Sequence, residues 1–111
     1  MTPRVATSVL VGALVRKAEA EGGFAAVLAK GDAAAGSLLL VLTERGAAPQ
    51  IFERMLQPDG RYGWAEPGDR PATQEVPALV ARRRRIDPDL WVLELDVPHP
   101  ERFAAELDAF D

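Results

Sequence analysis

Four consecutive arginines, Arg82 to Arg85, are the residues whose type and spacing most suggest chemistry in this chain. Guanidinium groups bind phosphate and carboxylate oxygens through paired hydrogen bonds, so an arginine run is a candidate site for nucleic acid or a phosphate ligand. A helix turns by roughly 100° per residue, however, so four successive side chains point almost all the way round its axis. In a helix, Arg82, Arg83, Arg84 and Arg85 therefore cannot form one flat patch.

The same four residues also fit the end of a helix. Cations in the last helical turn interact favourably with the negative end of the helix dipole. Asp87 and Asp89 follow closely and can neutralise the arginines, while Pro88 forces the residue before it out of the helical conformation. We favour this structural interpretation and keep an anion-binding site at Arg82, Arg83, Arg84 and Arg85 as the alternative. A contact between this turn and a protein partner is a further alternative.

Paired carboxylates offer a second kind of chemistry, either acid–base catalysis or the binding of a divalent cation. Glu94 and Asp96 lie two residues apart, which places them on one face of a strand. His99 is the only histidine and there is no cysteine, so a zinc site, an iron–sulfur cluster and thiol catalysis lack their ligands. We therefore predict no metal and no cofactor, and we favour a non-catalytic protein over a small carboxylate-dependent enzyme. The enzyme would gain support if Glu94 or Asp96 lined a closed pocket.

Residues 31–37, GDAAAGS, have a superficial likeness to a phosphate-binding loop. The lysine that such a loop needs is absent, because Ser37 directly follows Gly36. The segment also leads into a strand-like run and not into a helix whose N-terminus could receive an anion. We therefore exclude a nucleotide-binding loop here.

Aromatic residues suggest an interaction surface instead. Tyr62 and Trp64 are two residues apart and share one face of a short strand, and Phe52 and Arg54 share a face of the preceding strand. If the two strands align, Arg54 could stack on Trp64. A half-exposed aromatic edge is a candidate contact for a partner or a second copy, so Phe52, Arg54, Tyr62 and Trp64 are our candidate surface. The structural interpretation, which we favour for these residues, is that the loop 66–72 covers the core here.

Composition limits the choice of partner and compartment. The chain has 111 residues, and we expect residues 1–111 to form a single domain. Its net charge of −4 is opposite in sign to that of most nucleic-acid-binding domains, so nucleic acid would need a local basic patch. The apolar run near the N-terminus is shorter than the about 20 residues of a membrane span, and Arg16 and Lys17 make it a poor secretion signal. We predict a cytoplasmic protein with no membrane partner.

The periodicity of apolar residues predicts three helices and five strands. Helices are expected over 7–21, 73–86 and 100–110, and strands over 24–30, 37–43, 50–57, 61–65 and 90–97. Thr7 or Ser8 is expected to cap the first helix, and Ile86 to lie on the buried side of the second. The strand SLLLVLT at 37–43 is apolar on both faces, which is typical of a strand buried on both sides.

The order α-β-β-β-β-α-β-α places strands in a run and is typical of an α+β fold. We expect residues 24–65 to form an antiparallel meander of four strands. With the fifth strand they would make a five-stranded, mostly antiparallel sheet with the helices on one face.

Several of these segments together resemble a family of short alphaproteobacterial proteins. The segments are RKAEAEGGFAAVLAKGDAAAG, FERMLQPDGRYGW, DPDLWVLELD and ERFAAE, and the resemblance runs from about Arg4 to Phe110. The family is the domain of unknown function 1491. The resemblance implies a bacterial, cytoplasmic, single-domain protein, and it transfers no activity and no functional residue to this chain. Our preferred hypothesis is a non-catalytic protein-interaction domain, with a homodimer as one form of it.

Overall fold

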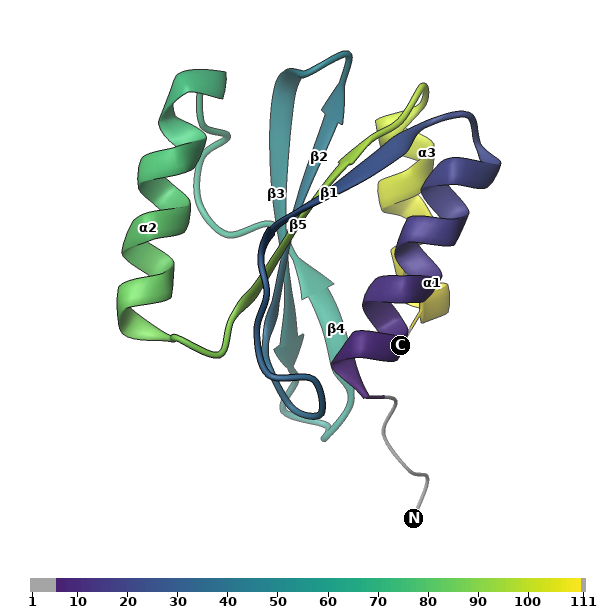
Figure 1. Cartoon of the computed structure of the whole chain (residues 1–111). Helices are drawn as coiled ribbons and strands as arrows, with labels where there is room; N and C mark the ends of the chain where they lie inside the picture. The colour runs from purple at the N-terminus through teal and green to yellow at the C-terminus, as the bar shows by residue number, and fades with distance from the viewer. Residues whose placement is uncertain (1–5, 111) are drawn as a thin grey trace.

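The chain folds into one five-stranded sheet with helices on both of its sides (Figure 1). The computed structural model describes residues 6–110. The helices are α1 (Thr7–Ala20), α2 (Val76–Ile86) and α3 (Pro100–Ala105), with the short 3-10 turns η1 (Thr73–Glu75) and η2 (Leu107–Phe110). The strands are β1 (Phe24–Ala29), β2 (Leu38–Glu44), β3 (Ala47–Leu56), β4 (Tyr62–Ala65) and β5 (Trp91–Asp96). The predicted α+β class and the order α-β-β-β-β-α-β-α are both confirmed.

The order of the strands across the sheet is β1-β5-β2-β3-β4. β2 and β5 run parallel and the other three pairs are antiparallel, so the prediction of a mostly antiparallel sheet is confirmed. The predicted meander of residues 24–65 is wrong, because β5 lies between β1 and β2. The centre of a sheet covered on both faces favours the strand with the larger apolar side chains. β5 is buried along most of its length, whereas the alanine-rich β1 is mostly exposed.

Each face of the sheet has its own apolar core beneath its own helix layer (Figure 1). The core beneath α1 and α3 contains Leu10, Leu14, Leu38, Leu40, Leu42, Leu93, Leu95 and Phe103. The core on the opposite face, beneath α2, contains Leu39, Val41, Ile51, Val76, Leu90 and Val92. The expected placement of all helices on one face is therefore wrong. Successive side chains of β2 point to opposite faces, and because β2 is apolar on both, both faces have to be covered.

The glycine-containing loop 31–37 closes the N-terminal end of α1. The backbone N–H groups of Thr7 and Ser8 donate to the carbonyl oxygens of Ala34 and Ala33, at 3.4 and 3.0 Å. The Thr7 hydroxyl donates to the carbonyl oxygen of Gly36 at 2.7 Å. The expectation that Thr7 or Ser8 caps the helix through its side chain is wrong, because loop carbonyls accept from these N–H groups instead. These carbonyls occupy the place that an anion would take in a phosphate loop.

The two glycines of this loop allow it to lie against the start of β5. Asp32 N–H donates to the carbonyl oxygen of Asp89 at 3.0 Å, and the indole N–H of Trp91 donates to the carbonyl oxygen of Asp32 at 2.7 Å. A Cβ atom at Gly31 would overlap the Asp89 carbonyl oxygen and would lie 2.7 Å from Cδ1 of Trp91. Gly31 is therefore required by close backbone approach, not by phosphate binding.

Replacing Gly31 with alanine should lower the free energy of unfolding by about 1–3 kcal/mol, because the new methyl group overpacks this contact. Gly12→Ala is the matched control, since a Cβ atom there meets only the flexible end of Arg16, at 3.3 Å from Nη1. Alanine is the better helix former by about 1 kcal/mol, so the control should be as stable as the wild type or more stable. Urea unfolding measures both variants, and equal stabilities would contradict the proposed contact.

Candidate functional site

The arginine run divides into two side chains that the fold uses and two that face solvent. Arg84 Nη1 donates to the carbonyl oxygens of Pro88, Leu90 and Lys30, at 2.7, 3.1 and 3.3 Å. It thereby fixes the connection from α2 to β5 and joins it to the end of β1. Arg83 forms an ion pair with Glu53 of β3, which attaches α2 to the sheet.

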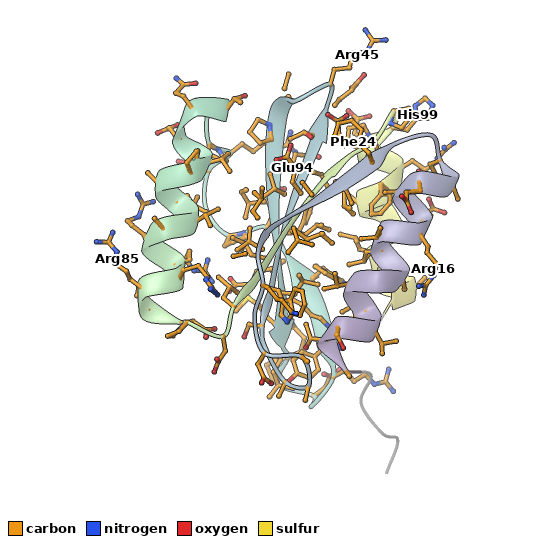
Figure 2. The ribbon with its side chains drawn as sticks, viewed as in Figure 1. Arg16, Phe24, Arg45, Arg85, Glu94 and His99 are labelled. Atoms are coloured by element: carbon orange, nitrogen blue, oxygen red, sulfur yellow. The ribbon has the colours of Figure 1, made fainter. Side chains whose placement is uncertain are left out.

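Arg82 and Arg85 are exposed, and Figure 2 shows Arg85 on the outer side of α2, away from the sheet. Ile86 is 83% exposed, so the expectation of its burial is wrong. In the last turn of α2, Arg83 and Arg84 make the inward contacts, which leaves Ile86 on the outside. Of the four anion-binding candidates, two thus have side chains available to a ligand.

The four aromatic-edge candidates come together at the β3–β4 hairpin. Arg54 lies opposite Trp64 in the strand register, but its guanidinium group lies over the ring of Tyr62, 4.3 Å from the ring centroid. Phe52 and Trp64 pack against the core beneath α1 and α3. All four residues are half-buried. β4 is an edge strand as expected, with Trp64 packed against the core and Tyr62 beneath the Arg54 guanidinium group.

The other edge of the sheet is the more exposed one, and the sequence interpretation missed it. β1 pairs with β5 along one side, and no strand within residues 6–110 pairs with its other side. Phe24, Val27 and Leu28 are 64%, 52% and 42% exposed. The strand carries no charge and no proline, the usual devices that keep a free edge from pairing. The uncharged apolar sequence FAAVLA could have indicated this surface, but the predicted candidate surface lay on the strands at 50–57 and 61–65.

An apolar cleft of about 400 Å³ lies beside this edge, between α2 and the sheet. It is lined by Leu28, Val41, Thr43, Gly46, Pro49, Thr73, Val76, Pro77, Val80 and Glu94. The single carboxylate among these residues belongs to Glu94, and its Oε2 accepts a hydrogen bond from the Thr43 hydroxyl at 3.3 Å. Figure 2 shows Glu94 and Phe24 toward the same end of the molecule as Arg45 and His99.

Asp96, the other carboxylate on this face, serves the fold. Its two carboxylate oxygens accept from the backbone N–H groups of Arg45 and Gly46, at 2.8 and 2.7 Å. Both turn residues have positive φ, 54° and 74°, as a two-residue hairpin turn requires. Asp96 thus fixes the β2–β3 turn, and the two carboxylates that the sequence pairs have different roles.

A further charged group links α1 to the C-terminal helices. Lys17 Nζ lies 2.8 Å from Oε2 of Glu21 and 3.3 Å from Oε1 of Glu106. The hydrogen bond to Glu21 raises the pKa of Lys17, which keeps this group charged. The contact is structural and lies on the face opposite the Glu94 cleft.

Residues 6–110 contain neither a metal-ion cluster nor a membrane-crossing helix. That part of the chain contains no group of three or more His, Cys, Asp or Glu side chains arranged to hold a metal ion. None of its helices combines the length and the apolar character that a bilayer crossing needs.

Comparisons with known proteins give the family. Residues 5–105 match the family described as "Protein of unknown function (DUF1491)". The chain belongs to this family, and the resemblance inferred from the sequence is confirmed. A comparison with curated proteins finds no match.

Solved structures of the family have the same fold. A crystal structure of a DUF1491 family protein from Caulobacter crescentus CB15 is 35% identical, with a TM-score of 0.81 over 90% of this chain and 94% of that one. An NMR structure of a DUF1491 family protein from the same organism is 34% identical, with a TM-score of 0.80 over 92% and 94%. A solution structure of a protein from A. tumefaciens is 30% identical, with a TM-score of 0.72 over 86% and 87%.

The different roles of neighbouring arginines can be measured. Arg84→Ala should lower the free energy of unfolding by about 1.5–3 kcal/mol, because it removes hydrogen bonds from a charged donor to three carbonyl groups. Arg85→Ala, one residue away and exposed, should change it by less than about 0.5 kcal/mol. Urea unfolding of both variants gives the comparison. Equal losses would show that Arg84 does not fix the α2–β5 connection.

Proposed function

We propose that this protein is a non-catalytic protein-interaction domain whose contact surface is the free edge of β1. The observation that carries the proposal is an uncharged edge that no strand of residues 6–110 pairs, with three large exposed apolar side chains, Phe24, Val27 and Leu28. We further propose that the edge receives an extended segment of another protein as an additional strand.

A free strand edge presents backbone N–H and C=O groups to any segment that lies beside it. Full burial of a valine, leucine or phenylalanine side chain is worth about 1.5–3 kcal/mol each. Covering three half-exposed side chains therefore contributes a few kcal/mol before the cost of ordering the partner. β1 is thus better suited to a partner strand than β4, whose aromatic residues are already half-buried.

Other readings have less support. The edge of β4, with Phe52, Arg54, Tyr62 and Trp64, remains a secondary candidate surface for a partner or a homodimer. Anion binding by the arginine run would rest on Arg82 and Arg85, because the fold already uses Arg83 and Arg84. The carboxylate-dependent enzyme required a closed pocket, and the cleft that contains Glu94 is partly open to solvent.

We take the protein to be cytoplasmic. The segment that could be mistaken for a secretion signal forms α1, and its Leu10, Leu14 and Ala18 are buried in the core. Removal of this segment by a signal peptidase would expose one face of the sheet. This supports the proposal that the segment is part of the folded domain and not a secretion signal.

The proposal is tested by site-specific photo-crosslinking in cells that produce the protein, with the crosslinker at position 27 or at position 9. Val9 is 57% exposed on α1 and is therefore the matched control for Val27. We expect a discrete crosslinked product with one other protein from position 27 and none from position 9. The same product from both positions, or no product from position 27, would overturn the proposal. A crosslinked dimer of two copies of the chain would identify the partner as a second copy of this protein.

The partner identified in this way should then be purified and its affinity measured by calorimetry. Val27→Lys should weaken binding by about tenfold or more, because it places a charge in the apolar contact. Val9→Lys should leave the dissociation constant within about a factor of two. Equal effects of the two substitutions would show that β1 is not the contact surface.

A further inference from the structure

The strand register places Glu94 directly behind the most accessible part of β1. Ala26 pairs with Glu94 and Phe24 pairs with Asp96, and directly paired residues of neighbouring strands point to the same face. The large side chains of Phe24 and Leu28 therefore flank a gap at the small, exposed Ala26. This gap leads from the free edge to the Glu94 carboxylate, and Leu28 itself lines the cleft.

Glu94 differs from the other half-buried acidic side chains of the central strands in what it contacts. Glu53 is paired with Arg83, and Asp96 accepts two backbone hydrogen bonds from the β2–β3 turn. Glu94 accepts one long hydrogen bond from the Thr43 hydroxyl, and no basic group among residues 6–110 lies within ion-pair distance of it. Its half-buried carboxylate thus has a neutral hydrogen-bond partner and no cationic one within the described residues.

We propose that the Glu94 cleft binds an arginine or lysine side chain of the partner segment that lies along β1. This inference rests on the proposed function and names the chemistry of the partner. The apolar walls formed by Leu28, Val76 and Val80 suit the methylene stem of such a side chain, and the carboxylate pairs with its charged end. The net charge of −4 also favours a basic segment.

The distances agree with this arrangement. Neighbouring strands lie about 4.8 Å apart, so a strand added beside β1 lies about two spacings, roughly 10 Å, from β5. A long cationic side chain and the Glu94 side chain can span this distance together across Ala26. A second copy of the chain that paired through its own β1 would have no cation within Phe24–Ala29, and its nearest one is Lys30, directly after the strand.

The cleft can be tested without the partner, by NMR titration of the ¹⁵N-labelled protein with pentylguanidinium. Saturable shifts should appear at the amides of Thr43, Val80 and Glu94, and they should weaken at high salt. Pentanol, which has the same apolar stem and no charge, should not produce them. Glu94→Gln should weaken the binding of pentylguanidinium by about tenfold or more, the loss of one charge-assisted hydrogen bond. Glu101→Gln, an exposed acid on α3, should have no effect.

The two proposals fail in different ways. Val27 pairs with Leu93 and points to the α1 side, so Val27→Lys should weaken partner binding by about tenfold or more and leave the pentylguanidinium site intact. Glu94→Gln should weaken both. Unchanged pentylguanidinium binding in Glu94→Gln would overturn the cleft. If Glu94→Gln loses pentylguanidinium but keeps the full affinity for the partner, the cleft serves a free small cation, and the partner side chain is overturned.

Discussion

The parallel pair formed by β2 and β5 is the contact on which the rest of this structure depends. Both strands carry apolar side chains on both faces, and nearly all of these side chains are fully buried. Such a pair is stable only when each face is covered, so α1 and α3 have to pack on one side and α2 on the other. β5 pairs with the side of β2 that does not pair with β3, and β1 pairs with the other side of β5. β1 therefore lies at the edge of the sheet. The position of the candidate surface is thus a consequence of how the centre is built.

Local patterns were enough to locate the elements, and they failed on relationships between distant segments. The helix and strand positions follow from apolar spacing, and SLLLVLT correctly indicated a strand buried on both faces. That property already implied two helix layers, but the run of consecutive strands suggested a simple meander. The pairing of β1 with β5 joins segments from opposite ends of the chain, and no local feature of FAAVLA specifies it. The roles of Arg84 and Gly31 were hidden for the same reason, because their contacts are backbone carbonyls in other loops.

The charged side chains of this protein differ in whether other groups of the fold pair with them or donate hydrogen bonds to them. Arg83, Arg84 and Asp96 have partners within the molecule, and each fixes a helix, a connection or a turn. Glu94, on the same strand face as Asp96, has a single hydroxyl partner within the described residues. Sequence alone could not make this distinction, since Glu94 and Asp96 look like one acidic pair on a strand. The difference depends on whether a turn or a cleft lies above each carboxylate.

The long separation of β1 and β5 in the chain has a consequence for how the protein is made. A ribosome synthesises β1 well before β5, the strand that pairs with it. Until then the apolar segment FAAVLA has no partner on either side and resembles the segments that chaperones shield. Once β5 is in place, one side of β1 is closed and the other becomes a defined template. The edge proposed for recognition is therefore formed only in a molecule whose synthesis has reached β5.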